Sequence, residues 1–215
     1  MISGLPVELI ERTLFLCWTM PLSMADRIRL MTSAPLVNSS WGWIFLRVSS
    51  RDVYVPCPSF AHHFLQILRP QSLPNVLCRS LTPKFDAAAG SRRVAELLHR
   101  FHDISAPAVP NLRRIHIEYR DMGFDCVFDN WTLVAFPPQV TELELSYSFS
   151  PAMPPWLRST LRSKHKRQTD RPPWITPSVR TLTILGGSES LVLDMVMTCP
   201  NAQLVTYRCS PHSVV

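Results

Sequence analysis

The sequence predicts an α/β protein made of a helical segment, residues 1–48, followed by a domain of short parallel strands, residues 49–215. Two patterns lead to this prediction. Apolar residues recur at helical spacing up to residue 48, and after residue 110 one strand motif recurs four times. Composition agrees, because 46% hydrophobic and 18% charged residues are typical of a folded chain. The 20 prolines against six glycines favour many short elements joined by rigid turns.

Three short helices are expected in the N-terminal segment. The first carries apolar residues at helical spacing from Leu5 to Trp18. The second follows Ser23, a suitable N-cap residue, and the third begins after Pro35 and continues to Val48. Because about 40 residues can seldom bury enough apolar surface to fold alone, we expect this segment to pack on the rest of the chain or on a partner.

Two short runs in this segment occur in a characteristic order, Leu5-Pro6-x-Glu8-Leu9-Ile10 first and Leu36-Val37-Asn38-x-x-Trp41 later. Together they resemble an F-box, over residues 4–48. In that family a segment of three helices binds a Skp-type adaptor and brings a substrate receptor to a cullin-based ubiquitin ligase. The resemblance implies a set of apolar residues that divide between adaptor contact and packing within the segment: Leu5, Pro6, Leu9, Ile10, Leu36, Val37 and Trp41. The alternative is an ordinary amphipathic cap of three helices.

Between residues 49 and 110 the chain predicts a mixture of strands and helices. Residues 51–55 alternate and predict a strand, which prolines stop. The run 60–68 has the apolar spacing of a helix. A further short strand is expected within 73–85, and a helix is expected over 91–101.

From Pro110 onward the motif Pro-x-apolar-x-x-apolar-x-apolar occurs four times. The alternation predicts a strand with one buried face, and the proline fixes the turn that leads into it. A fainter copy starts at Pro74, where Arg79 occupies the second apolar position. The first apolar positions of the four copies are separated by 28, 39 and 23 residues: Leu112, Val140, Val179 and Ala202.

This strand periodicity resembles a short, irregular leucine-rich-repeat array, which many F-box proteins carry for substrate recognition. The asparagine that closes a well-formed repeat is missing; Tyr119, Ser148 and Gly187 stand near its place. The alternative is an irregular α/β domain in which four strands share a turn habit. Both interpretations predict a parallel sheet with right-handed crossovers.

The longest interval contains a basic, proline-rich insertion at residues 148–175. We favour a solvated loop, because only Trp156 and Trp174 are available there for base stacking. The other interpretations are a nuclear-import signal or a patch for RNA or acidic partners. The patch would consist of Arg158, Arg162, Lys164, Lys166, Arg167 and Arg171.

No catalytic, cofactor-binding or metal-binding residues are predicted. The six cysteines are scattered, without a C-x-x-C pair or a histidine at zinc-finger spacing. The histidine pairs His62-His63 and His99-x-x-His102 are each incomplete as metal sites. Motifs of serine hydrolases, P-loop proteins and dinucleotide-binding proteins are absent. We therefore expect a non-catalytic subunit, with ubiquitin transfer carried out by its partners.

The net charge of +6 and the pI of about 9.3 are too modest, unless clustered, to predict a nucleic-acid partner. There is no signal peptide and no apolar window of membrane-spanning length, so we expect a cytoplasmic or nuclear protein, monomeric outside its complex.

The expected function is substrate recognition in a Skp–cullin–F-box ubiquitin ligase, with an unidentified protein substrate. The alternatives are an interaction scaffold outside any ligase, or a binder of RNA or acidic partners through the insertion.

Overall fold

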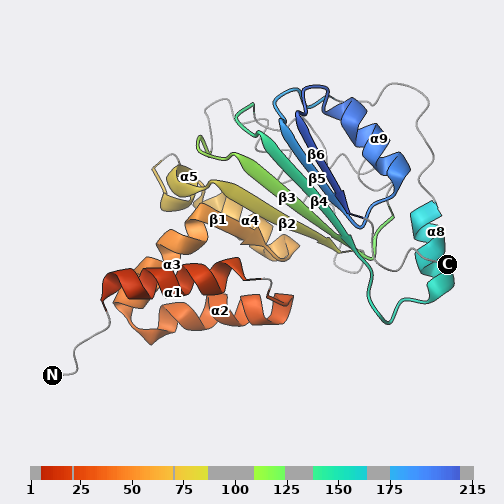
Figure 1. Cartoon of the computed structure of the whole chain (residues 1–215). Helices are drawn as coiled ribbons and strands as arrows, with labels where there is room; N and C mark the ends of the chain where they lie inside the picture. Colours follow the sequence, from red (N-terminus) through yellow and green to blue (C-terminus); the bar gives the residue numbers. More distant parts are fainter. Residues whose placement is uncertain are drawn as a thin grey trace.

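The computed structural model describes residues 6–20, 22–69, 71–86, 109–123, 138–163 and 175–208. This part of the chain contains seven helices and one six-stranded sheet, so the predicted α/β class is confirmed. The three N-terminal helices stand beside the first strand, at one end of the sheet (Figure 1). The predicted helix over 91–101 and the residues His99 and His102 lie outside the described ranges.

The N-terminal helices are α1 (Val7–Thr19), α2 (Met24–Val37) and α3 (Ser39–Arg51). Ser23 caps α2, because its Oγ accepts a bond of 3.2 Å from the Asp26 N–H. The third helix does not begin after Pro35, as the sequence predicted. Residues 35–37 complete α2, and the break falls at the extended Asn38, whose Oδ1 caps α3 by accepting from the Trp41 N–H at 2.9 Å.

The three helices form a small core that includes the first strand of the sheet. Trp18 packs edge-to-face on Phe45, with ring centroids 5.5 Å apart. Tyr54, from the strand that follows α3 directly, is 7% exposed and lies in the same cluster. The other buried members are Ile10, Leu14, Ala34, Ile44 and Val48. The helical segment therefore packs on its own sheet, which provides the apolar burial that its length alone could not.

All six strands run parallel and are ordered in the sheet as they are in the chain. They are β1 (Asp52–Val55), β2 (Ser80–Asp86), β3 (Arg114–Arg120), β4 (Glu142–Ser148), β5 (Thr181–Leu185) and β6 (Leu204–Arg208). The remaining helices are α4 (Pro58–Ile67), α5 (Leu73–Leu77), α8 (Pro155–Ser163) and α9 (Glu189–Thr198). The predicted parallel sheet is confirmed, and side chains of α4 and α9 join its apolar core.

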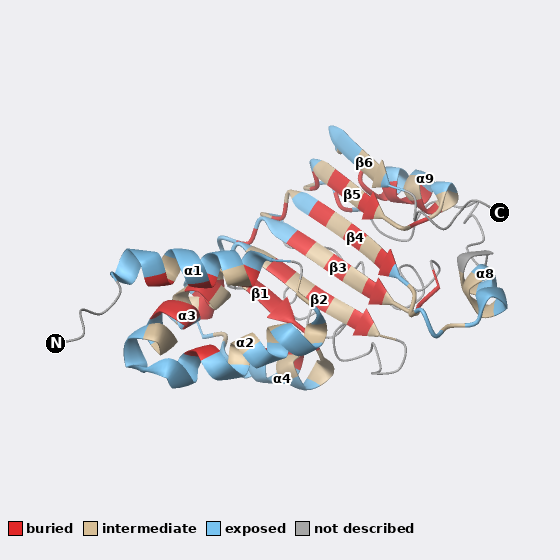
Figure 2. Cartoon of the chain, turned by 60° about the horizontal axis from the view of Figure 1, so that its bottom comes forward, coloured by how far each residue is buried: buried red, intermediate tan, exposed pale blue. Residues whose placement is uncertain are grey.

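The repeat motif explains which side chains the strands bury. Buried residues alternate with half-buried or exposed ones along β2 to β5 (Figure 2). In the first three full copies every apolar position of the motif is at most 1% exposed: Leu112, Ile115, Ile117, Val140, Leu143, Leu145, Val179, Leu182 and Ile184. In the fourth copy Val205 is 40% exposed, because β6 is the edge of the described sheet and has a neighbour on one side only.

The fainter copy at Pro74 was placed two residues too early. The strand register pairs Leu81 with Ile115, so Cys78 occupies the first apolar position and Val76 is 44% exposed. Residues 73–77 form α5, whose first turn accommodates Pro74. Pro83 lies within β2, where it cannot donate to the ladder, and no β2–β3 pair is formed at that residue.

Three aromatic rings stack across the buried face of the sheet. Tyr119 lies between Phe85 and Tyr147, with ring centroids 5.4 and 4.8 Å apart. The stack stops at β5, where Gly186 follows the strand with φ of +74°. A Cβ atom at this glycine would lie 2.5 Å from the Tyr147 carbonyl oxygen, so the close approach requires glycine.

Candidate functional site

The N-terminal helices leave an unusual amount of apolar surface exposed. Leu36 and Val37, at the end of α2, are 83% and 58% exposed, and Leu9 in α1 is 51% exposed. The start of α1 and the end of α2 lie at the end of the helical segment that points away from the sheet (Figure 1). The other exposed apolar residues of these helices are Val7, Phe15, Leu16, Met20, Ile28, Trp43 and Leu46. Apolar side chains exposed in such number on three short helices are typical of a protein interface.

The residues predicted for adaptor binding fall into two groups. Pro6, Leu9, Leu36 and Val37 are exposed, whereas Ile10 is 7% exposed and belongs to the helical core. Trp41 is half-buried against the same core, and Leu5 lies outside the described residues. We refer to Pro6, Leu9, Leu36 and Val37 as the apolar end. Sequence reasoning did not assign the remaining exposed apolar residues to a binding surface, although α1 carries apolar residues around most of its circumference.

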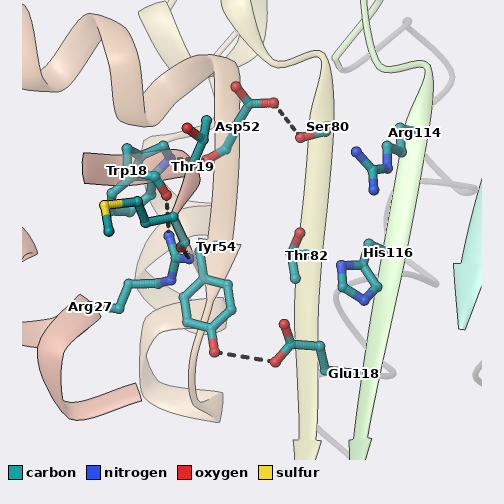
Figure 3. Close-up of a pocket in the computed structure, with 11 residues that line it drawn as sticks. Trp18, Thr19, Arg27, Asp52, Tyr54, Ser80, Thr82, Arg114, His116 and Glu118 are labelled. Atoms are coloured by element: carbon teal, nitrogen blue, oxygen red, sulfur yellow. Dashed lines mark hydrogen bonds between the residues drawn. The ribbon is translucent and has the colours of Figure 1, made fainter. Parts of the chain in front are cut away.

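A second feature is a cleft of about 350 Å³ where the helices meet the polar face of the sheet (Figure 3). Its floor is β2, whose small residues Ser80 and Thr82 lie between taller side chains of β1 and β3. One wall comes from the helices and β1, and the other from β3. The lining residues are Trp18, Thr19, Met20, Arg27, Asp52, Tyr54, Ser80, Thr82, Arg114, His116 and Glu118.

Arg27 fixes the helical wall of the cleft. Its guanidinium donates to the carbonyl oxygens of Trp18 at 2.7 Å and Met20 at 3.0 Å, which lie at the C-terminal end of α1. The same group lies 5.0 Å from the ring of Trp18 and 4.6 Å from the ring of Tyr54. Arg27 thus connects α2 to both α1 and β1.

Replacing this guanidinium should loosen the helices from the sheet. We expect Arg27→Gln to lower the free energy of unfolding by about 2 kcal/mol, the size of a lost set of charge-assisted hydrogen bonds. Urea denaturation measures this change. The matched control is Arg29→Gln on the same helix, where an exposed side chain only approaches Asp26 at 3.7 Å; there we expect a change below about 0.5 kcal/mol. Equal losses in the two variants would contradict the role given to Arg27.

Buried and half-buried polar groups set the electrostatics on the sheet side of the cleft. The Tyr54 hydroxyl donates to Glu118 Oε2 at 3.4 Å, and burial, followed by the Glu118 charge, raises its pKa. His116 Nε2 lies 2.9 Å from Ser146 Oγ and 3.6 Å from Glu144 Oε1. Burial lowers the pKa of His116; Arg114 acts in the same direction, and the carboxylates of Glu144 and Glu118 oppose it.

The half-buried His116 predicts a pH dependence of stability. Because its pKa in the folded protein lies below the ordinary value of 6.5, the unfolded chain takes up a proton more readily. The free energy of unfolding should therefore fall as pH drops through 6.5 towards the folded-state pKa. Urea denaturation between about pH 5.5 and 7.5 measures this. His116→Gln should flatten the profile in that range; an unchanged slope would contradict the assignment.

The cleft is suited to recognition by hydrogen bonds. The Ser80 hydroxyl donates to Asp52 Oδ1 at 2.5 Å, and it is therefore not donated to His116 across the cleft. Thr82, Glu118 and Arg114 present a hydroxyl, a carboxylate and a guanidinium to a ligand. Among the described residues, no group of three or more His, Cys, Asp and Glu side chains could hold a metal ion.

The predicted basic patch is described at only one side chain. Arg158 is half-buried, and its Nη2 donates to the carbonyl oxygens of Ser150 at 3.2 Å and Met153 at 3.5 Å. Arg158 therefore holds the turn before α8. The Arg162 backbone lies in α8, while Lys164, Lys166, Arg167 and Arg171 fall outside the described residues. In the ranges that the structure covers, no helix has the length and apolarity needed to cross a membrane.

Comparisons of the chain with protein-family models, with curated proteins and with solved structures found no match.

Proposed function

We propose that this chain is a substrate-recognition subunit of a Skp–cullin–F-box ubiquitin ligase. The observation that carries the proposal is the exposure of the apolar end: Pro6, Leu9, Leu36 and Val37 are all exposed, as an adaptor-binding surface requires. These residues come from the two runs of sequence that resemble an F-box. The chain would hold a substrate close to the ubiquitin-charged enzyme, and its partners would carry out ubiquitin transfer.

The mechanism relies on a rigid connection between two surfaces. The helices bind the adaptor through the apolar end, while the polar face of the sheet and its cleft hold a protein substrate. Trp18 Nε1 donates to the Asp52 carbonyl oxygen at 2.7 Å, and Tyr54 packs in the helical core, so both surfaces belong to one packed unit. A substrate held in this way has a high effective concentration near the ubiquitin-charged enzyme.

The function is tested by reconstitution. We expect the purified chain, mixed with a Skp-type adaptor, a cullin–RING module and the ubiquitin-charging enzymes, to become ubiquitinated itself, because receptors held close to the charged enzyme are modified in the absence of substrate. Omitting the adaptor should abolish this modification. If the chain is modified equally with and without adaptor, or not at all, the proposal fails.

A second candidate is an interaction scaffold outside any ligase, in which the helices cap the first strand of the sheet. Tyr54 favours this, because its place in the helical core shows that α1 and α3 cover β1. A cap alone, however, gives no reason for the exposure of Leu36 and Val37. The scaffold would bind partners through the sheet and leave the adaptor unbound.

A further inference from the structure

The residues just before the six strands form a continuous ladder of backbone hydrogen bonds. The ladder runs across the sheet at the N-terminal ends of the strands. The Arg79 N–H donates to the Arg51 carbonyl oxygen at 2.7 Å, and the Arg113 N–H donates to that of Arg79 at 2.9 Å. The ladder continues from Arg113 to Thr141 at 2.9 Å, to Arg180 at 2.7 Å and to Gln203 at 2.8 Å. Because all strands are parallel, these positions lie at the edge where the strands begin (Figure 1).

Four of the six positions in this ladder are arginines, which we name the arginine column: Arg51, Arg79, Arg113 and Arg180. Strands in a sheet are about 4.8 Å apart, so Arg79 and Arg180 are separated by about 14 Å at the backbone. Arg79, Arg113 and Arg180 are exposed. The ladder fixes the spacing of these residues at the backbone.

Within the described part of the chain, only one arginine of the column forms an ion pair with a carboxylate. Arg51 pairs with Glu11 at 3.2 Å. Arg113 Nη1 donates to the carbonyl oxygens of Pro110 and Leu112, and Arg180 Nη1 lies 3.4 Å from that of Asn201. None of Arg79, Arg113 and Arg180 forms an ion pair with a carboxylate in the described part of the chain. Like charges in a row repel one another, and an acidic ligand would relieve this repulsion.

Charged groups on the adjoining strands do not neutralise the column. Arg114, next to Arg113, is a further exposed cation and pairs with Glu144. Asp52, at the start of β1, accepts the Ser80 hydroxyl. Glu142, at the start of β4, is the exposed carboxylate next to Thr141, the position that interrupts the arginines.

We propose that the arginine column binds an acidic, extended segment of a partner protein. An extended chain advances about 3.3 Å per residue, so about five residues span the distance from Arg79 to Arg180. The planar guanidinium matches the carboxylate in geometry. The described column contains no aromatic side chain on which a base could stack, which favours a peptide over a nucleic acid. That this partner is a substrate of the ligase rests on the proposed function. That the column binds an acidic segment does not rest on it.

The test uses the full chain and a fluorescently labelled short polyglutamate peptide, measured by fluorescence anisotropy. Arg79→Gln/Arg113→Gln/Arg180→Gln should weaken binding about tenfold, the size expected for three exposed charge pairs. Binding should also weaken as salt is raised. The matched control is Arg12→Gln/Arg29→Gln/Arg208→Gln, which removes the same charge from exposed arginines outside the column and should retain binding. Thermal unfolding of both variants shows whether they remain folded.

Several outcomes would overturn the inference. They are no binding of the peptide by the wild-type chain, equal weakening in the two triple variants, or tighter binding of a single-stranded RNA of similar length. The proposed function is separated from this test, because adaptor binding uses the apolar end. If the chain binds the peptide but not the adaptor, the arginine column stands as a binding surface and the ligase proposal is refuted. If the chain binds the adaptor but not the peptide, the ligase proposal stands and the column is refuted.

Discussion

Leu36→Asp should abolish binding of a Skp-type adaptor while leaving the protein folded. Leu36 is 83% exposed and lies beside the exposed Val37 at the end of α2. A carboxylate at the centre of an apolar interface loses its water without gaining a partner, so we expect affinity to fall at least about 100-fold. Because the side chain contacts little of its own chain, the free energy of unfolding should change by less than about 0.5 kcal/mol. Titration calorimetry and urea denaturation measure the two effects.

The matched control is Leu193→Asp in α9, at the other end of the sheet. Leu193 is 47% exposed and also lies on a helix, but it is remote from the apolar end. We expect this variant to bind the adaptor as the wild type does. If both variants lose binding, or if neither does, the apolar end is not the adaptor-binding surface.

Tyr119→Ala should produce the largest loss of stability. Its ring is fully buried and stacks on Phe85 and Tyr147 across three adjacent strands. Removing a buried aromatic ring leaves a cavity, which costs about 3–5 kcal/mol, a large share of the stability of a typical domain. Urea denaturation followed by far-ultraviolet circular dichroism measures the change.

Tyr119→Phe provides the comparison, because it keeps the stacked ring and removes only the hydroxyl group. We expect this variant to lose no more than about 1 kcal/mol, because only a single polar group is removed. A loss in Tyr119→Ala no larger than that in Tyr119→Phe would show that the stack contributes little to stability.

The sequence predicted those elements whose signal is local. The helices α1 and α4 and the strands β3, β4 and β5 follow from apolar spacing and from the proline that precedes each strand motif. The strand expected within 73–85 corresponds to β2, but its motif copy was placed two residues too early, because Cys78 occupies the first apolar position and Pro83 lies within the strand. The limits of α2 and α3 depend on the cap at Asn38, which a proline three residues earlier obscured.

Features formed between elements could not be predicted from spacing. The stack on Tyr119 requires the register of three strands, and the cleft requires Arg27 to meet Tyr54. The arginine column, by contrast, did leave a signal. An apolar residue, an arginine, any residue and a second apolar residue recur in Cys78–Leu81, Leu112–Ile115 and Val179–Leu182. The arginine was treated as the unspecified position of the motif, because its alignment across strands appears only when the sheet is assembled.

Hydrogen–deuterium exchange of the full chain, with and without a purified Skp-type adaptor, would locate the adaptor interface directly. The full chain is required, because removing the helices would uncover Tyr54 and the edge of β1. We predict a complex of one adaptor per chain, with protection concentrated in α1 and the last turns of α2 and no change in β3 to β5. Failure of the folded chain to bind the adaptor, or protection on the sheet instead of the helices, would contradict the proposed adaptor-binding role of the N-terminal helices.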